Sequence, residues 1–297
     1  VRDAICAGVP GEERRRLHLH VADTRSSAPG DHLAEVAFHL AEAAPLGGIE
    51  RTLDALRRAG DQARAAFDFE QAYDLYARAI ELGERWPHPD SAFRCELLIR
   101  AGEVAVHDRE LQEGRLALEE AMELARAEGD AERFARAALL YAYSSDYLAA
   151  ASAEVVDRLR EAHALLDHRD AALRARVLSR LAVEERYRRD GVERAESLVA
   201  EATQLATAAG DSRTLARVLE DTSLVRWSPL DPESWIALNH DIVRASRASG
   251  DYDLLFQGMK GLVTGYMEIG DRAAMDRQID ASARLAQAFP APYPSAA

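Results

Sequence analysis

Small and apolar residues recur along the chain in a helical pattern that repeats about every 40 residues. In each repeat a mostly small residue is followed three positions later by an apolar one, and residues with this spacing share one face of a helix. The small positions are Ala79, Ala121, Ala162, Ala202, Ile242 and Ser282, and the apolar positions are Leu82, Leu124, Leu165, Leu205, Ala245 and Leu285. Because small side chains let a neighbouring helix approach closely, the pattern predicts a tightly packed helix in every repeat.

Gly and Asp mark the ends of the predicted helices with the same period. One series consists of four aspartates 40 or 41 residues apart, three of them preceded by glycine: Asp130, Asp170, Asp211 and Asp251. Glycine ends a helix in the left-handed conformation, and aspartate begins the next by accepting hydrogen bonds from its free N–H groups. A second series lies half a period away, at Asp190-Gly191, Asp231-Pro232 and Gly270-Asp271. Two corners in every repeat predict two antiparallel helices, and we interpret the corners as structural rather than as ligand sites.

The predicted fold is therefore all-α: an α-solenoid of antiparallel helix pairs with tetratricopeptide-like packing, wound as a right-handed superhelix. In such repeat proteins each pair buries its apolar face only against its neighbours. The composition agrees, because Ala, Leu, Arg and Glu dominate the sequence and lose least on entering a helix. We expect a helical lead-in over residues 1–47, about six helix pairs over 48–289 and a Pro-rich tail over 290–297.

Charge and cysteine content limit the classes of partner. The formal net charge is −14, which argues against nucleic acid because a duplex-binding domain needs a basic face. The sequence contains no apolar run of about 18 residues and no signal peptide, so we expect no membrane contact. Cys6 and Cys95 are far apart and form no CxxC pair, which is typical of reduced thiols in a cytoplasmic protein.

Motifs for catalysis are absent from the sequence. It has no GxxxxGK[ST] loop, and Lys260 lies within a predicted helix, so no P-loop can cradle a nucleotide. It also lacks GxSxG, HExxH and CxxC. His18 and His20 diverge on one helix, while His32 and His39 share a face without a third ligand, so neither pair predicts a metal site. We expect no enzyme activity, no cofactor and no metal in this chain.

Two stretches of sequence carry a resemblance to a known family. The first begins with "VRDAICAGVPGEERRRLHLHVADTRSS" and continues through "LAEVAFHLAEAA" and "AGDQARAAFDFEQAYDLYARAIEL", within the first 85 residues. The second is "RWSPLDPESWIALNHDIVRASRASGD", with Trp227, Pro229, Asp231, Pro232 and Glu233 in register. These stretches resemble the repeat region of LuxR-type bacterial regulators that contain a large signal-transduction ATPase, related in layout to MalT. The ATPase motifs and the helix-turn-helix of that family are not in this chain.

The resemblance implies a sensory role. In that family the repeat region binds a small-molecule inducer or a regulatory protein and thereby shifts the ATPase domain between two states. For this chain, the resemblance implies that the ATPase domain and the effector domain lie outside the given sequence. A ligand shifts such a switch only through its different affinities for the two states. The alternative is an interaction scaffold that binds a helix or peptide, fused in the parent protein to a cyclase or kinase effector.

Candidate contact residues lie on the first helix of each predicted pair, which lines the concave surface in tetratricopeptide-like packing. Aromatic and arginine side chains that combine apolar faces with hydrogen-bonding tips suit small-ligand and peptide sites. The candidates for a concave binding groove are Tyr141, Tyr187, Arg226, Trp227 and Tyr266, and their neighbours Tyr143, Tyr147 and Arg186 are of the same kind. The alternative is that most of these side chains only pack near helix ends.

Overall fold

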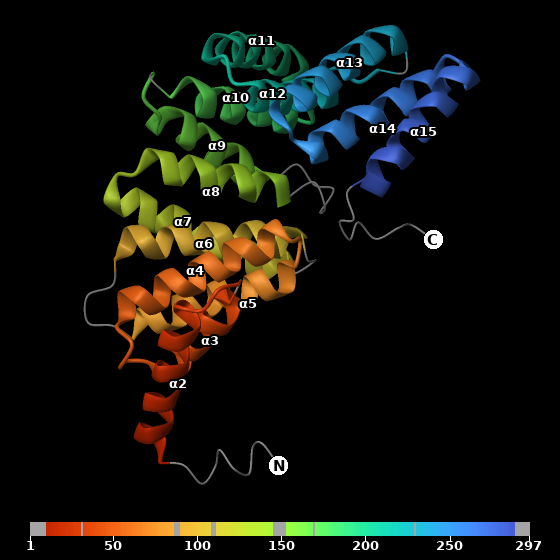
Figure 1. Ribbon diagram of the computed structural model, residues 1–297. Coiled ribbons are helices and arrows are strands. Elements are labelled where there is room, and N and C mark those ends of the chain that lie inside the picture. The colour runs from red at the N-terminus through yellow and green to blue at the C-terminus, as the bar shows by residue number, and fades with distance from the viewer. Residues whose placement is uncertain are drawn as a thin grey trace. The chain divides into compact units, whose positions relative to one another are not determined.

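The computed structural model describes residues 10–30, 32–85, 90–107, 111–144, 153–168, 170–228 and 230–288. Every regular element within these ranges is a helix (Figure 1). The expectations for Cys6, Tyr147, Pro229 and the tail at 290–297 lie outside the described residues. The chain divides into two compact units, Val1–Gly129 (unit 1) and Asp130–Ala297 (unit 2), and each is described by itself.

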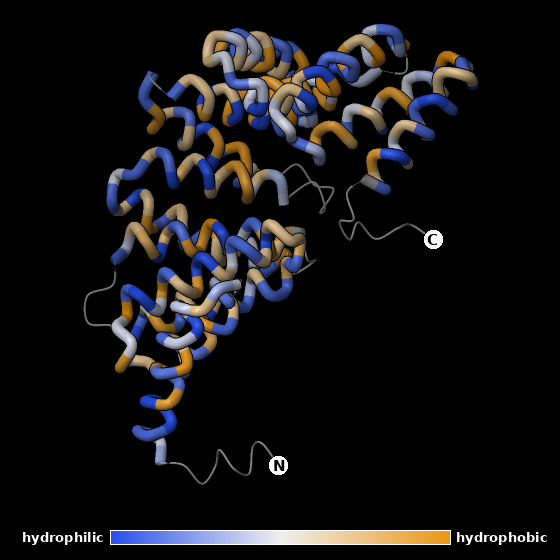
Figure 2. The backbone as a smooth tube through the Cα atoms, in the orientation of Figure 1, coloured by the Kyte–Doolittle hydropathy of each residue, from blue (hydrophilic) through white to orange (hydrophobic). Residues whose placement is uncertain are grey.

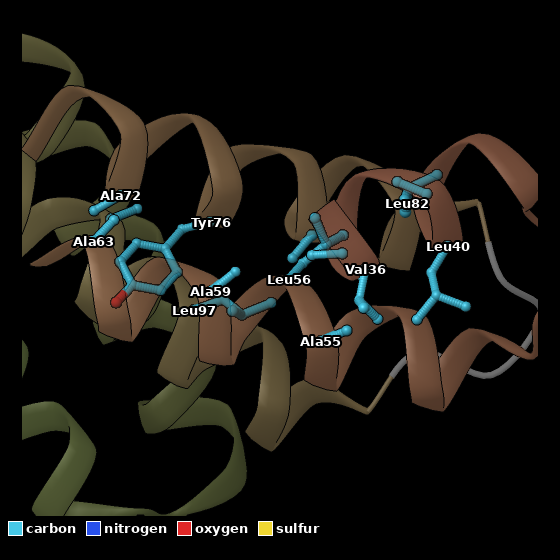
Figure 3. Close-up of a cluster of buried hydrophobic side chains, with 14 of the residues drawn as sticks. Val36, Leu40, Ala55, Leu56, Ala59, Ala63, Ala72, Tyr76, Leu82 and Leu97 are labelled. Atoms are coloured by element: carbon cyan, nitrogen blue, oxygen red, sulfur yellow. The ribbon is translucent and has the colours of Figure 1, made fainter. Parts of the chain in front are cut away.

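The described part of unit 1 contains two lead-in helices followed by two helix pairs. The lead-in helices are α2 (Gly11–Ser26) and α3 (Leu33–Ala43). The pairs are α4 (Ile49–Ala65) with α5 (Phe69–Glu84), and α6 (Ser91–His107) with α7 (Leu111–Glu128). One hydrophobic cluster joins α2 to α6, and Figure 3 shows Leu56, Ala59, Tyr76 and Leu97 meeting inside it. The lead-in helices therefore share the core of the first repeats.

Unit 2 consists of four further helix pairs in the described part of the chain. They are α8 (Ala131–Ser144) with α9 (Ala153–Leu165), α10 (Ala171–Arg186) with α11 (Gly191–Ala209), α12 (Ser212–Arg226) with α13 (Pro232–Ser249), and α14 (Tyr252–Glu268) with α15 (Arg272–Ala288). The first helices α8, α10, α12 and α14 pack successively on one another, while the second helices pack mainly against first helices. The first helices thus form the inner layer of unit 2.

The prediction of an all-α repeat fold built from helix pairs is confirmed. The handedness of the superhelix and the boundaries drawn at residues 47 and 290 stay predictions. Along each helix the hydropathy alternates between apolar and polar stretches (Figure 2), as expected for helices that bury one face. No helix in the described ranges is long and apolar enough to cross a membrane.

The small residues of the repeat pattern are buried between helices, except Ser282, which is half-buried. Ala79, Ala121, Ala162 and Ala202 are fully buried at 0% exposure, and Ile242 is 1% exposed. The apolar residues three positions later are less buried, and Leu165 is 46% exposed. The small positions, more than the apolar ones, therefore set how closely the second helices approach their neighbours.

Enlarging one of these residues should strain the packing. We expect Ala162→Leu to lower the free energy of unfolding by about 1–3 kcal/mol, because added methylene groups in a packed core force side chains and backbone to shift. Ala164→Leu makes the same change at an exposed position of α9 and should stay within about 0.5 kcal/mol. Urea denaturation of both variants measures the difference, and equal stabilities would contradict the close-approach role of Ala162.

The glycine–aspartate corners behave as predicted, with two exceptions. Gly129, Gly210 and Gly250 adopt φ of 70°, 67° and 70°. The carboxylates of the following aspartates accept from the backbone N–H groups of Arg133 (2.9 Å), Thr214 (2.9 Å) and Leu254 (3.1 Å), respectively. Asp170 is the first exception, since its side chain makes no capping hydrogen bond.

At the second exception the two residue types exchange roles. Asp190 itself adopts the left-handed conformation, with φ of 57°. A Cβ atom on Gly191 would lie 1.8 Å from the carbonyl oxygen of Glu185, so only glycine allows the start of α11 to approach the end of α10 this closely. Gly191 is therefore required because it has no side chain, and not because its backbone adopts a left-handed conformation.

Candidate functional site

Four of the five sequence candidates lie at the C-terminal ends of inner helices. Tyr187 follows the last residue of α10, Arg226 ends α12, Trp227 follows it, and Tyr266 lies in the last turn of α14. Tyr187 and Trp227 are 69% and 43% exposed. They therefore lie on the edge of unit 2 where first helices turn into second helices.

The fifth candidate, Tyr141 in α8, is 1% exposed. Its side chain is packed inside unit 2 and is not accessible to a ligand in this structure. This agrees with the alternative that some aromatic residues near helix ends only pack. A helical pattern of apolar residues does not reveal which neighbour covers each one, and this is why the sequence could not separate Tyr141 from Tyr187.

A pocket of about 380 Å³ opens beside Trp227. Its walls come from the ends of α10 and α12, from α11, and from the first turns of α13. The residues that line it include Arg186, Glu196, Arg226, Trp227, Ser234 and Trp235. The volume is within the range of small-ligand sites, and the mixture of aromatic and charged walls is also typical of them.

Arginine side chains hold the walls of this pocket in place. The Arg186 guanidinium donates to the carbonyl oxygens of Val225 and, at 3.2 Å, Trp227. It thereby satisfies carbonyl groups at the end of α12, where a positive charge is also favoured by the helix dipole. Arg226 donates to Glu196 of α11 at 3.0 Å. Arg186 is thus a positioning residue for Trp227, and Arg226 is paired within the chain.

Tyr266 also has a partner inside unit 2. Its hydroxyl lies 3.0 Å from Nε2 of His240 in α13, and the two rings meet edge to face with their centroids 6.4 Å apart. On α14 the more exposed neighbour is Met267, at 58%. The exposed apolar side chains at this end of α14 are therefore Met267 and Ile269, the latter 45% exposed, and neither was predicted from the sequence.

A buried polar cluster on the inner helices was not predicted either. Ser179 of α10 donates to Oδ2 of Asp221 in α12 at 2.6 Å. Arg180 donates to Glu184 at 2.7 Å and to the Ala142 carbonyl of α8 at 3.3 Å. These side chains are at most 5% exposed. We call Tyr143, Ser179, Arg180, Glu184 and Asp221 the inner polar cluster.

Tyr143 of α8 lies at the centre of this cluster. The guanidinium carbons of Arg180 and Arg217 lie 5.0 Å and 5.5 Å from its ring centroid, within the range of cation–π attraction. The Tyr143 hydroxyl is buried and has no hydrogen-bond partner among the described residues. The cluster links three successive first helices through polar contacts rather than through apolar packing.

Burial changes the acidity of two groups in the cluster. It raises the pKa of Asp221 from 3.8 to about 7, against the opposing effects of Arg180 and the Ser179 hydroxyl. Burial, aided by the Asp221 charge, also raises the pKa of Tyr143 to about 12. Asp221 therefore changes its charge near neutral pH, where Tyr143 remains protonated.

The histidines pair across helices rather than within them. Nδ1 of His18 in α2 lies 2.8 Å from Nδ1 of His39 in α3, so one ring donates a hydrogen bond to the other. The sequence pattern pairs His18 with His20 and His32 with His39, so this contact between α2 and α3 was not predicted. Among the described residues, no group of three or more metal-ligating side chains is close enough to hold a metal ion.

Comparisons with known proteins identify the fold. No protein-family model matches the sequence, and no curated protein matches it. The chain is similar to aspartyl phosphate phosphatase F from Bacillus subtilis, with a TM-score of 0.65 and 10% identity over 93% of this chain and 69% of that one. It is also similar to a Rap protein complexed with competence and sporulation factor, with a TM-score of 0.61 and 10% identity over 93% and 82% of the two chains.

A third similar structure is a signal transduction ATPase with numerous domains that has a tetratricopeptide repeat sensor, from Pyrococcus horikoshii. The TM-score is 0.54 and the identity 14%, over 96% of this chain and 48% of the ATPase. The chain thus spans about half the length of that protein. At these identities the likenesses show the fold alone, and that fold is a tetratricopeptide-like helical repeat.

Proposed function

We propose that the chain is the partner-sensing repeat arm of a bacterial regulator of the LuxR type, which couples binding of an inducer or partner to an ATPase switch elsewhere in the parent protein. The observation that carries the proposal is the exposed edge of unit 2. Tyr187 and Trp227 are 69% and 43% exposed at the ends of well-packed helices, and Trp227 lines a pocket. Exposed aromatic side chains beside a pocket are typical of binding surfaces.

Two further observations support the sensory role. The resemblance in the first 85 residues and around Trp227 is to regulators that carry such an arm. One protein of similar fold uses its tetratricopeptide repeats as a sensor, and another was solved in complex with competence and sporulation factor. The alternative, an interaction scaffold that binds a helix or peptide without any ATPase, is favoured by the same exposed edge.

A screen with two arms tests the binding role. The whole chain is exposed to a displayed library of short random peptides and, separately, to a metabolite library with thermal shift as the readout. We expect at least one arm to give saturable binders, and Tyr187→Ala or Trp227→Ala to weaken them about tenfold, the loss expected of a binding hot spot. Tyr252→Ala removes a tyrosine that is 49% exposed at the start of α14 and should have no effect. Failure of both arms would contradict the proposal.

The coding sequence on either side of this segment distinguishes the LuxR-type regulator from the interaction scaffold. A P-loop upstream and a helix-turn-helix downstream would support the LuxR-type regulator. A cyclase or kinase domain would instead favour the scaffold. In a regulator, addition of the identified binder to the full-length protein should change its ATPase rate.

A further inference from the structure

Another pocket, of about 290 Å³, lies inside unit 1 where three helices meet. It is formed by the start of α4, the last turns of α5 and the first turns of α6. Most of its lining is apolar, and the apolar side chains are those of Ile49, Leu53, Ala79, Ile80, Phe93 and Leu97. The volume equals that of about ten water molecules. The pocket can therefore hold a compact ligand with a single ring.

This repeat lacks a side chain that the following repeats have at the same position. Gly83 lies four residues after Ala79 of the repeat pattern and is half-buried in the pocket wall. The corresponding residues of the next four repeats all have side chains and are at most 7% exposed: Ala125, Leu166, Ala206 and Ser246. A Cβ atom on Gly83 would meet only Cδ1 of Leu53, at 3.8 Å, and alanine is favoured over glycine inside a helix. Packing therefore does not require glycine here, and the glycine leaves the pocket open.

The rim of the pocket carries carboxylates that have no cationic partner. Glu50 and Asp90 are exposed, and neither makes an ion pair among the described residues. Asp90 accepts the backbone N–H of Phe93 at 3.0 Å and so caps α6. The guanidinium group of Arg94, which also lines the pocket, is held by Glu84 at 2.7 Å and by Glu120. Arg94 is thus neutralised twice, whereas Glu50 can accept a cation from outside the chain.

The wider surroundings of the pocket have the same sign of charge. The charged residues at the three helix ends, together with their ion-pair partners, comprise seven carboxylates and four arginines: Asp23, Glu42, Glu50, Glu81, Glu84, Asp90 and Glu120 against Arg51, Arg78, Arg85 and Arg94. All four arginines pair with carboxylates of this set. The surplus of negative charge favours a cationic ligand group over an anionic one.

We propose that this pocket is a binding site for a small primary amine whose apolar part is about the size of one ring. The apolar part fills the space beside Gly83, and the ammonium group faces Glu50 at the rim. A mostly apolar lining with a few polar groups that orient the ligand is typical of small-ligand sites. The site lies within unit 1 and does not depend on the edge of unit 2, on which the proposed function rests.

Three probes of similar size and different charge test the class of ligand: phenethylamine, phenethyl alcohol and hydrocinnamate. Each is titrated against the full chain, and binding is followed by saturation-transfer NMR of the probe. We expect phenethylamine to bind saturably and phenethyl alcohol to bind about fivefold more weakly, the most that an exposed ion pair usually contributes. Hydrocinnamate should bind most weakly, because its carboxylate meets the negative rim.

Two substitutions test the location of the site. Gly83→Leu places a side chain in the pocket and should abolish binding of all three probes without lowering the melting temperature, because leucine is favoured over glycine inside a helix. Glu50→Gln should remove the preference for the amine over the alcohol and leave binding of the alcohol unchanged. The control Glu70→Gln removes another exposed carboxylate from the first turn of a helix, at the opposite end of α5 from Gly83, and should change neither.

Other results would contradict the proposal in distinguishable ways. Equal binding of the three probes would refute the cationic class of ligand, and no saturable binding of any probe would refute the site. Phenethylamine binding that survives Gly83→Leu, or that is lost in Trp227→Ala, would refute the location. Glu50 is exposed, so Glu50→Gln remains decisive even where circular dichroism shows that Gly83→Leu is poorly folded. None of these results affects binders that depend on Tyr187 or Trp227, so the proposed function fails or stands separately.

Discussion

Replacing Arg180 with alanine should lower the free energy of unfolding by about 3–5 kcal/mol, the usual cost of breaking a buried ion pair from one side. Arg180 is 1% exposed and donates to Glu184 at 2.7 Å, whose side chain is 5% exposed. The substitution leaves the Glu184 carboxylate buried beside a cavity. Urea denaturation of the full chain, followed by circular dichroism and tryptophan fluorescence, measures the loss.

An exposed ion pair in the same unit provides the control. Arg272 pairs with Asp276 at 3.1 Å with the same i,i+4 spacing, and their side chains are 80% and 52% exposed. Arg272→Ala should therefore cost at most about 1 kcal/mol. The double variant Arg180→Met/Glu184→Leu removes both buried charges and should recover much of the stability lost in Arg180→Ala. An Arg180→Ala variant as stable as Arg272→Ala would mean that the inner polar cluster does not hold unit 2 together.

Asp221→Asn should make the protein more stable at neutral pH and remove a pH dependence that we expect of the natural chain. Burial raises the pKa of Asp221 in the folded state to about 7 from 3.8. A group whose pKa is raised on folding favours the folded state below its unfolded pKa, and this contribution is lost as the pH rises through the folded value. Between about pH 4 and pH 7 the natural chain should lose on the order of 4 kcal/mol relative to the asparagine variant.

Melting temperatures of both proteins across this pH range give the measurement. Asp211→Asn is the control of opposite sign, because hydrogen bonds from Thr214, led by its hydroxyl, lower the pKa of Asp211. The contribution of Asp211 is present above its unfolded pKa and is lost as the pH falls. A stability difference between the natural chain and Asp221→Asn that is flat from pH 4 to pH 7 would show that Asp221 keeps one charge state throughout.

The sequence by itself determined the elements of the fold, because their signals are local. Glycine at Gly129 and Gly210 ends a helix through its own backbone freedom, and the aspartate that follows caps the next helix within three residues. The column of small residues at Ala79, Ala121 and Ala162 repeats with the period of the helix pairs. These signals depend only on residues near each other in the chain, and they placed the helices and their pairing correctly.

Only the tertiary structure decided which side chains face water and which polar groups meet. Tyr141 and Tyr187 are both tyrosines near the end of a first helix, but the first is 1% and the second 69% exposed. Ser179 and Asp221 come from different repeats, and so do Arg186 and the end of α12. Such contacts depend on how one repeat is rotated against the next. That rotation results from the summed packing of whole helix faces, so no short stretch of sequence specifies it.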